Sequence, residues 1–182
     1  MQEVTFIIGL PGSGKSTLVE YYQNHPFVDY KIYDDWMECT FNRFEIKEFN
    51  SECRFSNLIE DIKQQSNILI TCIDFCKNDF LQKSEYYLKS HFPNLKVSRI
   101  YFENNPTKSE SNIRYRDKVN GGRWEKSEKD EMVYHGELYV PGGVNKGPLY
   151  EQEIKNSFKL SKEYIIPKGS TIFPIVVQQT DS

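Results

Sequence analysis

A glycine-rich segment near the start of the chain constrains the fold more than any other feature. Residues 9–16 read Gly-Leu-Pro-Gly-Ser-Gly-Lys-Ser and match the pattern G-x-x-x-x-G-K-[ST] in full. The preceding run from Val4 to Ile8 suits a buried parallel strand, and residues 16–22 favour a helix. In that setting the glycines let backbone N–H groups close around phosphate oxygens, at the positive end of the helix. We call residues 9–16 the glycine-rich loop and expect it to bind phosphate.

The side chains of the glycine-rich loop have separate expected roles. Lys15 can reach the outer phosphates of a nucleotide, and the Ser16 hydroxyl can bind Mg²⁺. The expected nucleotide-binding residues of this segment are Gly9, Pro11, Gly12, Ser13, Gly14, Lys15, Ser16 and Thr17. The alternative is a glycine-rich turn that matches the pattern by chance, although the motif fixes many positions and the flanking strand and helix fit as well.

Strands and helices alternate along the rest of the chain. Further strands are expected at residues 31–33, 68–73, 96–102 and about 171–177. Helices are expected over 55–62, from the cap Asn78 to before Pro93, from Pro106 to Gly121-Gly122, and near 154–160. This alternation predicts βαβ units and a mostly parallel sheet covered on both faces. Pro174 predicts an edge position for the last strand, because proline cannot donate to a strand ladder.

The length of 182 residues corresponds to one domain, spanning residues 1–182. Residues 121–148 are rich in glycine around a polar stretch that we expect to be helical. Together with the helix before it, this stretch is interpreted as a lid or insertion over the site, at about residues 105–148.

Charge and hydropathy exclude two classes of protein. The net charge of −3 excludes a basic nucleic-acid packaging protein. Residues 108–129 are locally basic, however, and a polyanion could bind there; their bases are Lys108, Arg114, Arg116, Lys118, Arg123, Lys126 and Lys129. No apolar run approaches the ~20 residues of a membrane span, and the N-terminus lacks the features of a signal peptide. We therefore expect a cytoplasmic protein with no membrane partner.

The cysteines and histidines indicate no metal site. Cys39, Cys53, Cys72 and Cys76 form no C-x-x-C pair and have no histidine at ligand spacing, so we expect reduced, buried thiols. The three isolated histidines are expected to have surface or capping roles; they are His25, His91 and His135.

Two acidic positions follow predicted strands. Asp74 comes after the most apolar strand, where it can hold Mg²⁺ or its waters, or can cap the next helix. Asp34-Asp35 follows the second strand, where one carboxylate can take a proton from an acceptor hydroxyl or cap a helix. The aromatic residues beside this pair, Tyr33 and Trp36, belong to the core or stack on an acceptor base.

Arginines on the helix that begins at Pro106 are candidates for contact with a transferring phosphoryl group. Arg114 and Arg116 lie two residues apart, so they face different sides of the helix and only one is expected to face the nucleotide. Arg123, beyond the Gly121-Gly122 pair, is a third candidate. The alternative for each is a solvated charged surface.

Three segments together resemble the kinase domain of polynucleotide 5′-hydroxyl kinases and the wider group of small P-loop kinases. They are residues 8–17, Asp34-Asp35-Trp36, and the strand that leads to Asp74. The likeness covers roughly the first 115 residues. It implies the α/β fold of P-loop NTPases, a three-layer sandwich with a central, mostly parallel sheet and a helical lid.

The resemblance also implies roles for single residues. Asp34 would be the general base for the acceptor hydroxyl, Asp74 would lie by the acceptor or metal, and Arg114 or Arg116 would contact the transferred phosphate. The family has an arginine three positions after the base, which grips the 3′ phosphate of the acceptor. Here that position is Met37, and Arg43 is the nearest arginine. This departure counts against a polynucleotide acceptor and leaves the kinase assignment unchanged.

The expected function is therefore an ATP- and Mg²⁺-dependent kinase that transfers the γ-phosphoryl group to a hydroxyl, most like a polynucleotide 5′-hydroxyl kinase. An alternative acceptor is a nucleoside, nucleotide or other small metabolite instead of a nucleic-acid end. The alternative from another class is a nucleotide-dependent ATPase or switch that acts through a partner, in which an acid–base pair at an acceptor cleft would have no obvious role.

Overall fold

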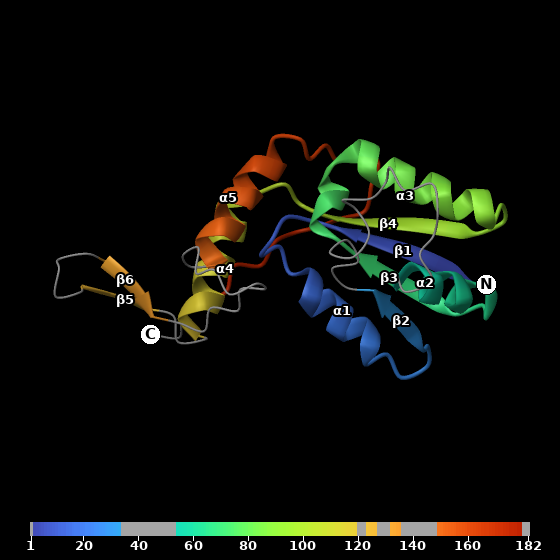
Figure 1. The fold of residues 1–182 in the computed structure, drawn as a ribbon, viewed down its shortest axis with the longest axis horizontal. Coiled ribbons are helices and arrows are strands. Elements are labelled where there is room, and N and C mark those ends of the chain that lie inside the picture. Colours follow the sequence, from blue (N-terminus) through green and yellow to red (C-terminus); the bar gives the residue numbers. More distant parts are fainter. Residues whose placement is uncertain (1, 34–53, 120–122, 127–131, 136–148, 180–182) are drawn as a thin grey trace.

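A five-stranded parallel sheet forms the centre of the molecule in the computed structural model, which describes residues 2–33, 54–119, 123–126, 132–135 and 149–179 (Figure 1). The strands lie in the order β2-β3-β1-β4-β7, and all four neighbouring pairs are parallel. Their bounds are β1 (Glu3–Ile8), β2 (Tyr30–Tyr33), β3 (Asn67–Thr71), β4 (Lys96–Phe102) and β7 (Ile172–Phe173). The prediction of an α/β fold with a mostly parallel sheet is confirmed.

Helices cover both faces of this sheet and extend past one end of it. The helices are α1 (Lys15–Gln23), α2 (Arg54–Lys63), α3 (Asn78–His91), α4 (Pro106–Val119) and α5 (Leu149–Ser161). In Figure 1, α1 lies below the sheet, α3 lies above it, and α4 and α5 lie beyond the left-hand end of the strands. A short 3₁₀ turn, η3 (Ile73–Cys76), connects β3 to α3. Among the described residues, none of the helices combines the length and the apolar character that a membrane span needs.

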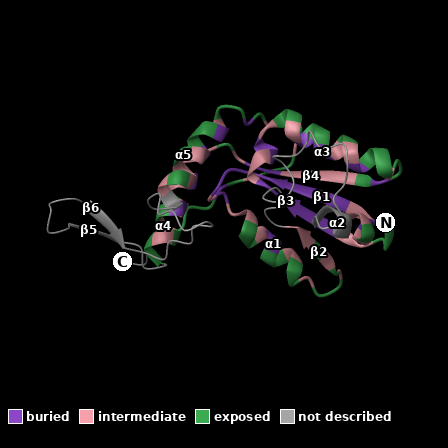
Figure 2. Cartoon of the chain, in the orientation of Figure 1, coloured by how far each residue is buried: buried purple, intermediate pink, exposed green. Residues whose placement is uncertain are grey.

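The core follows from the alternation of side chains along β1. Val4, Phe6 and Ile8 point to one face, where they share a cluster with buried residues of α2 and α3, among them Leu58 and Leu81. Ile7 points to the other face, where it packs with Val19 of α1 and Leu69 of β3. Burying each such side chain stabilises the fold by about 1.5–3 kcal/mol. Buried residues are accordingly concentrated in the sheet (Figure 2).

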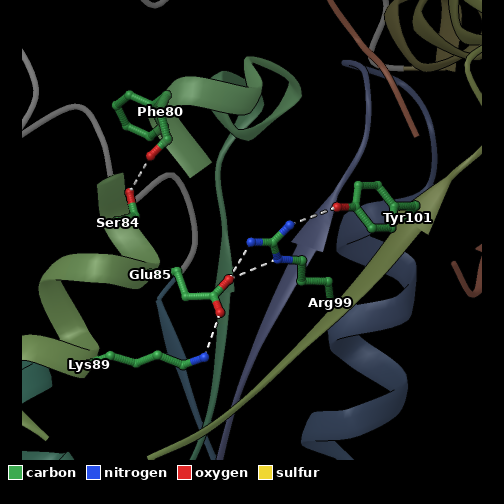
Figure 3. A network of polar contacts seen from close by, with 6 residues as sticks. All are labelled: Phe80, Ser84, Glu85, Lys89, Arg99 and Tyr101. Carbon is green, nitrogen blue, oxygen red and sulfur yellow. Dashed lines mark hydrogen bonds and ion pairs between the residues drawn. The ribbon is translucent and has the colours of Figure 1, made fainter. Parts of the chain in front are cut away.

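A polar network attaches α3 to β4 (Figure 3). The carboxylate of Glu85 accepts hydrogen bonds from the guanidinium of Arg99, one of them from Nε at 2.9 Å, and lies 2.8 Å from Nζ of Lys89. Nη1 of Arg99 also lies 3.4 Å from the hydroxyl of Tyr101. Burial alone would raise the pKa of Glu85, but the bonds from Lys89 and Arg99 outweigh burial and hold that pKa below its ordinary value. The network therefore keeps a half-buried charge paired.

Several predicted element bounds are wrong, each for a local reason. The third strand ends at Thr71, because the chain turns into η3 two residues later. Helix α3 has Lys77 at its N-cap without a side-chain cap, so Asn78 is its first helical residue and not its cap.

The last strand is also shorter than predicted, although its edge position is confirmed. It spans only Ile172–Phe173, because Pro174 has no N–H to donate to the sheet. The next N–H, on Ile175, donates instead to the carboxylate of Glu103 at 2.8 Å.

The polar helix predicted within residues 121–148 is wrong where the structure describes that stretch. Antiparallel strands β5 (Arg123–Lys126) and β6 (Met132–His135) pair there, with Trp124 opposite Tyr134. Aromatic and β-branched residues such as these favour strands over helices.

Candidate functional site

A cleft of about 640 Å³ opens at the carboxyl end of the sheet, where β1 and β3 end. This edge is where open α/β sheets bind ligands. One wall of the cleft is the glycine-rich loop with the start of α1, and η3 adjoins it. The rest of the lining comes from α4, α5 and the C-terminal segment. The lining residues are Pro11, Gly12, Gly14, Lys15, Ser16, Thr17, Cys72, Ile73, Asp74, Asn112, Tyr115, Arg116, Val119, Glu153, Asn156 and Gln178.

At two positions the glycine-rich loop has a left-handed backbone conformation that favours glycine. Gly12 has φ of +76°, and a Cβ there would lie 2.5 Å from the carbonyl oxygen of Ser109. Gly14 has φ of +104° and forms the N-cap of α1. The N–H of Ser13 donates to the carbonyl of Leu10 at 3.1 Å, which closes the turn. The loop is thus a tight turn that leads into a helix N-terminus, the arrangement that suits an anion.

The ammonium group of Lys15 lies within the curve of this loop. Its Nζ donates to the carbonyl oxygens of Gly9 at 2.8 Å and of Leu10 at 2.9 Å. Of the loop residues predicted to bind nucleotide, Gly9 and Ser13 are outside the cleft lining. The Ser13 side chain is 2% exposed, and its hydroxyl has no hydrogen-bond partner among the described residues. The loop therefore presents a lysine charge and the start of a helix to the cleft.

The two predicted metal ligands, Ser16 and Asp74, both line the cleft. Asp74 lies within η3, two positions further from its strand than predicted, and its Oδ1 is 3.0 Å from Nζ of Lys77. The hydrogen bond to Asp74 raises the pKa of Lys77. Asp74 does not cap α3, whose N-cap is Lys77. Among the described residues, no group of three or more His, Cys, Asp or Glu side chains is placed to hold a metal ion.

The two arginines of α4 point in different directions, as their spacing predicts. Arg116 lines the cleft, and its Nη2 donates to the carboxylate of Glu153 on α5. Arg114 lies outside the lining and pairs with Glu110 one turn earlier, at 2.7 Å. The third candidate, Arg123, is the first residue of β5. The structure therefore brings one arginine of α4, Arg116, to the same cleft as Lys15.

Ion pairs balance the charge of several bases in residues 108–129, the segment predicted to bind a polyanion. Lys108 lies 2.6 Å from the carboxylate of Glu103, Arg114 pairs with Glu110, and Arg116 pairs with Glu153. A base whose charge is balanced by an adjacent carboxylate contributes little to the long-range field that attracts a polyanion. The described part of residues 108–129 is accordingly less positive than its sequence indicates.

The predicted acceptor side of the site lies outside the described residues, which end at Tyr33 in this region and resume at Arg54. This covers Asp34, Asp35, Trp36, Met37 and Arg43. Tyr33 itself is described, and its hydroxyl donates to Oδ2 of Asp61 on α2 at 2.5 Å. Its partly buried ring packs against the core, which agrees with the core alternative predicted for Tyr33.

The prediction of buried thiols is confirmed for the described cysteines, and the described histidines are half-buried or exposed. Cys72 and Cys76 are free, buried thiols, and burial raises the pKa of Cys76 to about 12. Nδ1 of His25 accepts a hydrogen bond from the N–H of Phe27, and His91 lies exposed in the last turn of α3. Cys39 and Cys53 lie outside the described residues, as does the side chain of His135.

Two residues that support the site are absent from the sequence predictions. The buried hydroxyl of Tyr164 donates to the carbonyl oxygens of Phe102 at 2.5 Å and Ile8 at 3.2 Å, where β4 and β1 end. Burial raises the pKa of this phenol. The amide of Asn112, on α4, bonds to the glycine-rich loop. Neither belongs to a motif; the only sequence signal is that Asn112 lies one helical turn before Arg116.

A search against known protein-family models finds no match to this chain, and a search of curated proteins finds no significantly similar sequence.

Proposed function

We propose that the protein is an ATP-dependent kinase that transfers the γ-phosphoryl group to a hydroxyl acceptor. The observation that carries this proposal is the glycine-rich loop with Lys15 inside its curve, at the mouth of a cleft that also contains Ser16, Asp74 and Arg116. A tight glycine turn, a helix N-terminus and two cationic side chains match the needs of a polyphosphate. The parallel sheet and its flanking helices are compatible with a P-loop NTPase sandwich.

The residues of the cleft fit a bound magnesium nucleotide. Ser16 and Asp74 offer two oxygen ligands in one cleft, and protein-bound Mg²⁺ usually keeps water and substrate phosphates as its other ligands. Mg²⁺ would neutralise charge on the β- and γ-phosphates as the transition state forms. Asp74 would exchange its contact with Lys77 for the ion.

Phosphoryl transfer in this cleft depends on positioning and charge. Lys15 exchanges its two loop carbonyls for phosphate oxygens, and Arg116 leaves Glu153 for the γ-phosphoryl group. Asp34 accepts the proton of the attacking hydroxyl, so that the oxygen attacks phosphorus as the bond to the β-phosphate oxygen breaks. This assignment of Asp34 comes from the sequence alone.

Two classes of acceptor compete within this proposal. The resemblance favours a polynucleotide 5′-hydroxyl. The internal ion pairs of Lys108, Arg114 and Arg116, together with Met37, favour a nucleoside, nucleotide or other small metabolite. An ATPase or switch acting through a partner would use the same nucleotide contacts without an acceptor.

One experiment tests the proposal and separates these alternatives. The protein is incubated with γ-labelled ATP and Mg²⁺ together with oligonucleotides, nucleosides or sugars, with Lys15→Ala as the control variant. Label transferred to one acceptor class, and lost in Lys15→Ala with the circular dichroism unchanged, supports the kinase. Release of inorganic phosphate alone supports the ATPase. Turnover within tenfold of wild type in Lys15→Ala would show that the glycine-rich loop is not the nucleotide site.

A further inference from the structure

Asn112 connects three parts of the molecule that are distant in sequence. Its Nδ2 donates to the carbonyl oxygen of Gly12 at 3.0 Å and to that of Val176 at 2.9 Å. Its Oδ1 accepts the N–H of Gln178 at 2.8 Å. One side-chain amide thus joins α4 to the glycine-rich loop and to the C-terminal segment, using both of its donor hydrogens and its acceptor oxygen.

Helix α4 also packs directly against the tip of the same loop. A Cβ on Gly12 would lie 2.5 Å from the carbonyl oxygen of Ser109 and 2.8 Å from Cγ1 of Ile113. Ser109 and Ile113 are fully buried and lie on either side of Asn112 along the helix. This packing leaves no room between helix and loop, and the hydrogen bond from Asn112 to Gly12 fastens the loop to α4 at the same point.

The same amide belongs to the part of the cleft lining that α4 contributes. Asn112, Tyr115, Arg116 and Val119 recur at helical spacing and all line the cleft, so they form one face of α4. Gln178 lines the cleft too, and its backbone is held by Asn112. A shift at Asn112 would therefore change the distance between the loop and the wall that carries Arg116.

We propose that Asn112 is a positioning residue for the nucleotide: it holds the glycine-rich loop, α4 and the segment 176–178 in one arrangement that a polyphosphate can bridge. The inference about nucleotide rests on the proposed function, whereas the tie between loop and helix does not. The bond from Asn112 to the carbonyl of Gly12 prevents that peptide group from rotating. The adjacent N–H groups therefore keep the orientation that an anion needs.

The chain contains a matched control in Asn104. Nδ2 of Asn104 also donates to two backbone carbonyls, those of Ser161 at 2.8 Å and Tyr164 at 3.0 Å, and neither belongs to the glycine-rich loop. Each alanine variant therefore removes two hydrogen bonds donated by a side-chain amide to backbone carbonyls. Asn112→Ala also removes the bond that the amide accepts from Gln178. Asn112→Asp adds a test at constant shape, because a carboxylate cannot donate to the carbonyl of Gly12.

The test measures hydrogen exchange in the nucleotide-free protein and ATP affinity for wild type and the three variants. Asn112→Ala and Asn112→Asp are expected to speed amide exchange within residues 9–18 and to weaken ATP binding about tenfold, the worth of one or two hydrogen bonds. Asn104→Ala should leave both unchanged while lowering the melting temperature.

The outcomes separate this inference from the proposed function. Amide exchange in residues 9–18 that is no faster in the Asn112 variants than in Asn104→Ala would overturn the conclusion that Asn112 holds the glycine-rich loop. Faster exchange with unchanged ATP affinity would overturn the positioning role. If wild type and Asn104→Ala both fail to bind ATP, the proposed function fails, and the exchange measurement still decides whether Asn112 holds the loop.

Discussion

Arg116 and Glu153 face each other from two helices at the wall of the cleft, with Nη2 of the guanidinium donating to Oε2 of the carboxylate. Their side chains are 52% and 40% exposed, so the pair contributes only about 0.2–1 kcal/mol. A bidentate contact between arginine and phosphate is stronger than such a pair. Under the proposed function, Glu153 would therefore compete only weakly with a nucleotide phosphate for Arg116.

Replacing Glu153 by Gln is expected to tighten ATP binding about two- to fivefold, because Arg116 is released and a negative charge leaves the cleft. Isothermal titration calorimetry measures the change. The control Glu110→Gln removes the partner of Arg114, which lies outside the cleft lining, and should leave the affinity unchanged. In an Arg116→Gln background, Glu153→Gln should have less effect; an equal gain there would mean that Glu153 acts on phosphate directly and does not hold Arg116.

Asp34→Asn should lower phosphoryl transfer by roughly 10²–10⁴, the usual contribution of a positioned general base. ATP affinity should be nearly unchanged, because the residue is expected on the acceptor side. Steady-state kinetics with a nucleotide-binding assay distinguishes the two effects, and Asp35→Asn is the comparison. A variant that loses ATP affinity and keeps its rate would make Asp34 a helix cap and Asp35 the candidate base.

Gly12→Ala should destabilise the fold by roughly 2–5 kcal/mol, since it combines left-handed strain with a clash against Ser109. Gly169 provides the control: its φ is +81°, and a Cβ there would meet nothing within 4 Å. Gly169→Ala should therefore cost only the strain, about 1–2 kcal/mol. Urea denaturation measures both values. Equal losses would show that α4 yields to the new methyl group and does not press on the loop.

Tyr164→Phe should lower stability by about 1–2 kcal/mol at neutral pH, because the carbonyl oxygens of Phe102 and Ile8 lose a donor. The wild type should also lose stability above pH 10, since the pKa of the buried phenol is raised above its ordinary 10.0. There the unfolded chain releases a proton that the folded chain retains, so unfolding becomes more favourable as the pH rises.

Denaturation curves of wild type and Tyr164→Phe at pH 7 to 11 test this prediction. The stability difference should shrink as the pH rises above 10, because the variant lacks the group that titrates. A constant difference across this range would mean that Tyr164 ionises with its ordinary pKa in the folded protein.

Local sequence patterns were sufficient for the elements that carry the loop. The apolar run before Gly9 and the helix after Gly14 form as β1 and α1, and β4 has the predicted bounds Lys96–Phe102. Pro106 begins α4 as expected, with Oδ1 of Asn105 accepting the N–H of Lys108. Alternating elements also predicted a parallel sheet. These signals act over a few residues, because backbone preference and the spacing of apolar residues are local properties of the sequence.

The composition of the cleft wall was decided only by the tertiary structure. Helical spacing predicted that one of Arg114 and Arg116 faces the cleft, but the packing of α4 on Gly12 selects Arg116. The supporting bonds join positions far apart in the chain, 100 residues for Asn112 with Gly12 and 156 for Tyr164 with Ile8. No periodicity or short motif encodes such pairs, since they exist only after the sheet has brought the ends of its strands together.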